Sequence, residues 1–290
     1  MQDDAGEFTA AGARLFPLTI QNCYDIIILI NYTCLEVTEM NTEITDNVDG
    51  RRAVELFYRP VREISGGSTA FYQSQTRLNS RKFGVMLPDT YREVAEMSPQ
   101  CLSLFSLEFV QALEACAAFT ERELIFSWIS VYMPVWFLKE RRAERNLIEQ
   151  CGKFDVPTNK VCFQVSEKLL AEKESTAAEI IRNLRNRGFH FMLEDFGGDV
   201  CPMMRLADFP VDYVMLSPEV ANHIGKGERS DNAVKSIIGF VSDLGCEPVA
   251  DGVVSSKQAE MLYELGCAYC TGSLAGRYTA EKYIRLKNTD

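Results

Sequence analysis

Residues 184–197 read Leu-Arg-Asn-Arg-Gly-Phe-His-Phe-Met-Leu-Glu-Asp-Phe-Gly, and this stretch joins a helix end, an apolar strand and an acidic strand end. Apolar residues at helical spacing predict a helix over 175–187. The apolar run after it predicts a strand over 190–193. Glu194 and Asp195 follow that strand directly. The stretch therefore predicts a helix and strand unit that ends in two carboxylates.

The same unit recurs along the chain after residue 50. Short apolar segments predict strands over 54–58, 125–131, 161–165, 213–216 and 248–250, and helical spacing predicts helices over 232–244 and 256–265. Strands that alternate with helices predict an α/β fold with a mostly parallel sheet, and the number of units favours a closed barrel over an open sheet. We expect residues 51–290 to form this barrel domain and residues 1–50 to form an N-terminal extension of unknown structure.

Charge and composition exclude several classes of protein. The chain has 30 basic and 41 acidic residues, a net charge of −11, which disfavours a generic grip on the phosphates of nucleic acid. No run approaches the roughly 20 apolar residues that a membrane span needs. The start is acidic rather than basic, so we expect a cytoplasmic protein whose ten cysteines are thiols. With only two histidines, the chain lacks the ligands of a typical zinc hydrolase.

Acidic side chains follow several of the predicted strands. Glu194, Asp195 and Asp251 stand at strand ends, and the carboxyl ends of the strands form the mouth of an α/β barrel. Carboxylates gathered there are typical ligands of Mg²⁺ or Mn²⁺. The alternative is that they are remnants at a wet barrel mouth. We therefore expect no cofactor, or at most one weakly bound Mg²⁺ or Mn²⁺.

The chain from about residue 52 onward resembles the EAL family of metal-dependent phosphodiesterases, which cut cyclic di-GMP. The resemblance rests on residues 184–197, on Phe-Pro-Val-Asp-Tyr-Val-Met-Leu-Ser at 209–217, and on Pro-Val-Ala-Asp-Gly-Val at 248–253 with Thr-Gly-Ser at 271–273. It implies a TIM-like (β/α)8 barrel of the EAL type with one modified strand.

The resemblance also implies that the catalytic set is degenerate. By this alignment the Glu of the Glu-Ala-Leu signature falls on Ser68 and the Arg four residues later falls on Tyr72. An Asn metal ligand falls on Tyr132, a Glu on Gln164, and the Lys that helps to activate water on Met215. Two further positions become Ser217 and Thr271, while Glu167 is retained. Neutral oxygens and a thioether cannot replace these ligands and this base.

Four other residues are candidates for contact with a ligand or a partner. Arg59 takes the position of a ligand-binding Gln, where it either grips a phosphate or pairs with one of the acids at the mouth. Tyr72, Tyr132 and Trp136 would make part of the mouth aromatic. Exposed aromatic residues beside an Arg are typical interface anchors, whereas the plainer interpretation is that they belong to the core.

These residues lead to one functional expectation and two alternatives. We expect a catalytically inactive EAL-like domain that acts as a regulatory or protein-binding module in cyclic di-GMP-related signalling. The alternatives are a receptor that binds cyclic di-GMP without cutting it and, ranked last, an active phosphodiesterase. A protein partner is expected, and a homodimer is left open.

Overall fold

The computed structural model describes residues 47–285 apart from residues 49, 140–143, 172–174 and 199–201. Nearly all of the expected N-terminal extension, residues 1–46, therefore lies outside the described residues. Its boundary near residue 50 stays a prediction.

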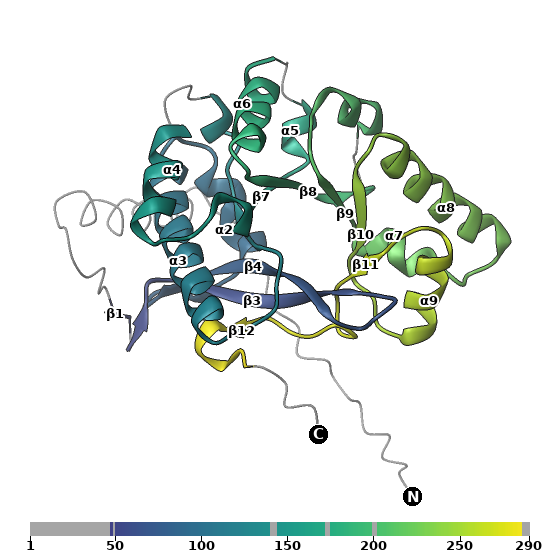
Figure 1. The fold of residues 1–290 in the computed structure, drawn as a ribbon, viewed down its shortest axis with the longest axis horizontal. Helices are drawn as coiled ribbons and strands as arrows, with labels where there is room; N and C mark the ends of the chain where they lie inside the picture. Colours follow the sequence, from purple (N-terminus) through teal and green to yellow (C-terminus); the bar gives the residue numbers. More distant parts are fainter. Residues whose placement is uncertain (1–46, 49, 140–143, 172–174, 199–201, 286–290) are drawn as a thin grey trace, which may run out of the picture.

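Eight strands close into a barrel, drawn at the centre of Figure 1. In spatial order they are β3 (Val54–Glu63), β11 (Tyr269–Cys270), β10 (Glu247–Ala250), β9 (Tyr213–Leu216), β8 (His190–Phe196), β7 (Val161–Val165), β6 (Ile129–Tyr132) and β4 (Thr69–Ser80). The sheet closes because β3 pairs with β4 as well as with β11. The expected TIM-like barrel is confirmed.

One barrel strand runs against the others, which fits the one modified strand that the resemblance implied. β3 is antiparallel to both of its neighbours in the barrel, whereas β4 and β6 to β11 are parallel to one another. β3 and β4 form a long hairpin in which Arg59 lies opposite Gln73. The hairpin turn includes Gly67, whose φ of +65° suits a residue without a Cβ atom. The register of this hairpin decides which residues of β4 reach the mouth.

Helices surround the barrel and follow most of its parallel strands (Figure 1). They are α2 (Pro88–Ala95), α3 (Cys101–Glu121), α4 (Glu144–Lys153), α5 (Lys168–Ala171), α6 (Ser175–Asn186), α7 (Pro218–His223), α8 (Glu228–Asp243) and α9 (Ser256–Glu264), with short 3₁₀ turns η1 (Phe137–Lys139), η2 (Thr158–Lys160), η3 (Met203–Asp208) and η4 (Glu281–Tyr283). Four short strands lie outside the closed barrel: β1 (Asn47–Val48), β2 (Arg51–Arg52), β5 (Gly84–Met86) and β12 (Thr279–Ala280).

Helix α3 is the one helix of the described ranges that is long and apolar enough to cross a membrane, with a hydropathy of 1.4. More than half of the most apolar part of this helix is buried within the protein. Gln111 on this helix accepts a hydrogen bond from the backbone N–H of Leu56 and donates one to the carbonyl of Val54, both on β3. α3 therefore packs as a core helix against the barrel.

Every predicted strand and helix falls on an element of the structure, but one strand starts later than expected and several elements, such as α2 and β11, were not predicted. The expected strand over 125–131 begins only at Ile129, and the side chain of Ile125 is 84% exposed. Strand β4 and helix α3 were not predicted as elements, because β4 is polar along much of its length and α3 is apolar on most of its faces.

Apolar side chains fill the lower part of the barrel. Phe71 stacks on Trp128 with the ring centres 3.8 Å apart, and Tyr213 and Tyr269 pack against Phe71. Above them, toward the carboxyl ends of the strands, Met192 and Met215 are buried in the same cluster. This packed interior forms a floor beneath the barrel mouth, as in other α/β barrels.

Candidate functional site at the barrel mouth

Buried polar side chains form a layer above the apolar floor. Gln73, Gln164, Glu194, Ser217 and Thr271 are all less than 9% exposed, and each comes from a different barrel strand or from the residue directly after one. The carboxyl ends of parallel strands meet at one end of a barrel, so residues far apart in sequence gather there. This layer is the candidate site.

The position of Ser68 is a correction to the sequence alignment. Ser68 lies in the exposed turn before β4, at the opposite end of the strand from the mouth, and its hydroxyl donates to Glu63. The residue of β4 that reaches the site is Gln73, five positions later. Arg77 follows Gln73 at the spacing of four that the Glu-Ala-Leu signature has. The position of Gln73 at the mouth and this spacing together indicate that the signature corresponds to Gln73-Ser-Gln-Thr-Arg77 in this chain.

Arg59 pairs with one of the acids at the mouth. Its Nη2 lies 2.6 Å from Oδ2 of Asp251, and its Nε donates to Oε1 of Gln73 at 2.7 Å. The ring of Tyr278 lies 4.8 Å from the guanidinium carbon. Burial alone would lower the pKa of Arg59, but Tyr278 and Asp251 raise it. Of the two interpretations of Arg59, the structure shows the ion pair with an acid.

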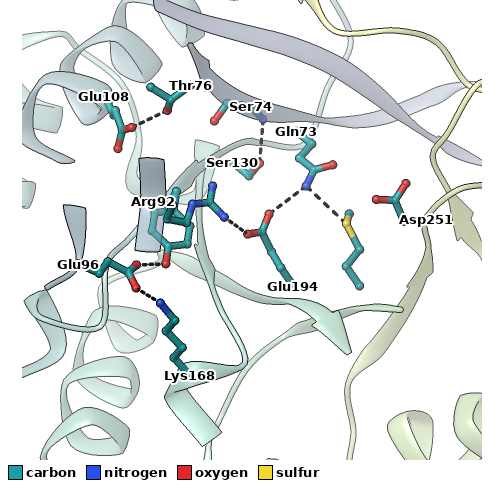
Figure 2. A network of polar contacts seen from close by, with 12 residues as sticks. Gln73, Ser74, Thr76, Arg92, Glu96, Glu108, Ser130, Lys168, Glu194 and Asp251 are labelled. Atoms are coloured by element: carbon teal, nitrogen blue, oxygen red, sulfur yellow. Dashed lines mark hydrogen bonds and ion pairs between the residues drawn. The ribbon is translucent and has the colours of Figure 1, made fainter. Parts of the chain in front are cut away.

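A second arginine, which the sequence analysis did not single out, pairs with Glu194. Figure 2 shows Arg92 of α2 and Gln73 of β4 pointing at the Glu194 carboxylate. Nη1 of Arg92 lies 3.3 Å from Oε2, and Nε2 of Gln73 lies 3.1 Å from Oε1. Burial raises the pKa of Glu194, and the positive charge of Arg92 opposes that rise. Arg92 has no distinguishing signal in sequence, because only folding brings α2 to the mouth.

Met215 lies beside the same amide. The Nε2 atom of Gln73 is 3.5 Å from the Met215 sulfur, and Met215 is buried. A thioether is a weak acceptor and carries no proton. Gln73 and Met215 therefore form an uncharged pair of side chains at the mouth.

The three aromatic candidates are not exposed anchors. Tyr72 is buried and packs against Phe119 of α3, with the ring centres 4.9 Å apart, so it faces the helix layer rather than the mouth. Tyr132 is buried at the mouth, where its hydroxyl donates to Glu96. Trp136 is half-buried, and its indole N–H donates to the carbonyl of Glu96 at 2.8 Å. These contacts inside the protein favour the plainer of the two interpretations, that the three side chains belong to the core.

The donor set at the mouth does not fit a pair of divalent cations. Glu194 and Asp251 are each held by an arginine, while Asp195 is exposed in a left-handed backbone conformation with φ of +57°. Across the residues that the structure describes, no group of three or more His, Cys, Asp or Glu side chains is arranged to hold a metal ion. Mg²⁺ and Mn²⁺ need several hard oxygen ligands, and here the positive charge already comes from guanidinium groups.

Two buried polar side chains at the mouth keep hydrogen-bonding capacity. Both side-chain polar atoms of Gln164 lack a hydrogen-bond partner within the protein, as does the hydroxyl of Ser217. Thr271, by contrast, donates to the carbonyl of Pro60 at 3.1 Å. An unpaired buried amide costs free energy, so Gln164 and Ser217 are the places where water or a ligand atom would be accommodated.

A closed barrel with one antiparallel strand and polar side chains at the carboxyl ends of its strands defines a TIM-like protein of the EAL type. The EAL domain family matches residues 42–278, and the chain belongs to this family.

Relatives with known names share this domain. The chain is 26% identical over 256 residues to the cyclic di-GMP phosphodiesterase RocR of Pseudomonas aeruginosa, and the matched region covers 86% of this chain and 64% of RocR. It is 27% identical over 187 residues to the cyclic di-GMP phosphodiesterase PdeB of Shewanella oneidensis, and the matched region covers 59% of this chain and 22% of PdeB. The chain thus spans less than two thirds of the length of these relatives.

A similar fold is seen in the crystal structure of the FimX EAL domain from Pseudomonas aeruginosa bound to c-di-GMP. The TM-score is 0.73 at 15% identity, covering 90% of this chain and 99% of the FimX chain. At this identity the likeness supports the barrel fold alone.

Proposed function

We propose that this chain is a catalytically inactive EAL domain that works as a regulatory module in cyclic di-GMP-related signalling. The observation that carries the proposal is the contact between Gln73 and Met215. At these two positions the family resemblance requires a Glu that holds metal and a Lys that helps to activate water. An amide and a thioether supply neither anionic charge nor a proton acceptor.

The remaining acids do not compensate for this loss. Metal-assisted hydrolysis lowers the pKa of a bound water and stabilises the charge of the leaving oxygen, so it needs cations held by several anionic ligands. Glu194 and Asp251 are instead committed to Arg92 and Arg59. Each lost function is worth several kcal/mol of transition-state stabilisation, and together they would leave turnover many orders of magnitude lower.

A domain without hydrolytic activity would act through binding. We propose that this module binds a protein partner in the cytoplasm. The seven cysteines within the described residues are free and buried, which suits a reducing compartment. With the mouth aromatics buried, the docking surface would lie on the helices or in the first fifty residues rather than at the mouth. A homodimer would be one form of such a contact.

A second candidate is a receptor that binds cyclic di-GMP without cutting it. The unpaired amide of Gln164 and hydroxyl of Ser217 favour it, because a ligand atom would satisfy them. Against it, both side chains are almost fully buried, so a ligand would reach them only if neighbouring side chains moved.

Two measurements test the candidates: isothermal titration with cyclic di-GMP, with and without Mn²⁺, reports binding, and chromatography of the same mixtures reports the product pGpG. RocR serves as the active control. No binding heat and no pGpG product support the inactive module. Binding without product supports the receptor. Product above a heat-killed control refutes both and leaves an active phosphodiesterase.

A further inference from the structure

Helix α2 is fastened to the barrel mouth through its last turn. Arg92 on this helix reaches Glu194 of β8, and its guanidinium carbon lies 3.7 Å from the centre of the Tyr132 ring. Glu96, directly after the helix, accepts from Tyr132 and from Nζ of Lys168 at 3.0 Å. Figure 2 shows Arg92 pointing at Glu194 and Lys168 pointing at Glu96.

The guanidinium of Arg92 lies where a cation would be needed. Glu194 is less than 9% exposed, and a buried carboxylate is costly unless a positive charge or several donors accompany it. Arg92 supplies that charge, and Gln73 supplies a further donor. Tyr132 holds the guanidinium plane by stacking, which is a contact that arginine makes better than lysine.

We propose that Arg92 is a built-in replacement for a divalent cation: it balances Glu194, keeps α2 closed over the mouth and excludes metal from this position. The functional significance of this inference rests on the proposed loss of hydrolysis. The exclusion of metal itself can be measured without any substrate. It also explains why a retained acid at the mouth is compatible with a metal-free fold.

The test compares two variants by Mn²⁺ binding, followed through the electron paramagnetic resonance signal of free Mn²⁺. Gln73→Glu places a second carboxylate beside Glu194 while both arginines remain. Gln73→Glu/Arg92→Ala removes the neighbouring guanidinium as well. We expect the double variant to bind Mn²⁺ at least tenfold more tightly than Gln73→Glu, because two facing carboxylates without a cation require one.

Lys168→Ala is the matched control, since it breaks the ion pair with Glu96, directly after α2, and leaves Glu194 paired. The wild type and Lys168→Ala should bind Mn²⁺ only at concentrations above roughly 1 mM, far weaker than a dedicated site. Equal Mn²⁺ affinity in Gln73→Glu and the double variant would overturn the inference, as would tight binding by the wild type. If the double variant does not fold, Arg92→Ala against Lys168→Ala decides by the same comparison. Hydrolysis by the wild type would refute the proposed function instead.

Discussion

The side-chain amide of Gln73 donates to the sulfur of Met215 at 3.5 Å across the top of the barrel. The same amide nitrogen donates to Glu194, and the amide oxygen accepts from Arg59. Gln73 thus links three strands of the mouth through neutral or fully paired groups. Around Gln73 the polar layer at the mouth is therefore a connected hydrogen-bond network.

Restoring the lost charges should not restore hydrolysis. The triple variant Gln73→Glu/Gln164→Glu/Met215→Lys regains two carboxylates and an ammonium group, but Tyr132 still fills the volume of a metal ligand and Arg92 still holds Glu194. We expect no pGpG above the heat-killed control when product is followed by chromatography in the presence of Mn²⁺. Turnover by the triple variant would show that Tyr132 and Arg92 do not block the site.

The register of the β3–β4 hairpin can be tested by placing one charge at two positions. Gln73→Glu puts a carboxylate about 3 Å from Glu194, and we expect it to destabilise the protein by roughly 1–2 kcal/mol at pH 8. Ser68→Glu lies in an exposed turn and should change stability by less than about 0.5 kcal/mol. Urea unfolding measures both. A larger loss of stability in Ser68→Glu than in Gln73→Glu would indicate that Ser68, and not Gln73, lies at the mouth.

Trp136 should behave as a packing residue. Trp136→Ala removes a half-buried ring and leaves the carbonyl of Glu96 without its donor, so we expect a loss of about 2 kcal/mol, or a melting temperature lower by roughly 5 °C. Tyr283→Ala, at an aromatic ring that is 68% exposed, is the control and should change little. An unchanged melting temperature in Trp136→Ala would return Trp136 to the candidates for a docking surface.

Glu108 of α3 gives a pH dependence of known sign. Burial raises its pKa from 4.5 to about 7, against the hydrogen bond from Thr76. The folded state therefore holds the proton more tightly than the unfolded state, and stability falls as the pH rises from about 4.5 through 7. The loss at pH 8 is on the order of 3 kcal/mol.

Glu108→Gln should remove this part of the pH dependence and make the protein more stable than the wild type at pH 8 but not at pH 4.5. Glu114→Gln, on the same helix but partly exposed, is the control. Chemical unfolding at several pH values measures the difference. Parallel curves for Glu108→Gln and the wild type would contradict the assigned protonation.

The sequence predicted the barrel because its signals are local. The apolar run over 190–193 predicts a strand, and the acids directly after it mark the end of that strand. Both features lie within ten residues of sequence. The register of β4 is not local, since it depends on how long the hairpin turn is before Arg59 meets Gln73. The sequence alignment therefore placed the signature at Ser68, five residues before the residue of β4 that reaches the mouth.

The partners of the site residues were also beyond local patterns. Glu194 and Asp251 were found as strand-end acids, but Arg92 comes from a helix a hundred residues before Glu194 in the chain. Burial of Tyr72 depends on α3, whose apolar faces gave no helical period to read. Such contacts are set by tertiary packing, so sequence predicts which residues gather at the mouth better than it predicts what they touch.

The central claim is tested most directly by incubating the purified wild-type chain with cyclic di-GMP and Mn²⁺ and measuring pGpG over time, beside RocR under the same conditions. The network around Gln73 and Met215 predicts no product above the heat-killed control. Steady formation of pGpG by the wild type, abolished by heat or by chelation of the metal, would contradict it.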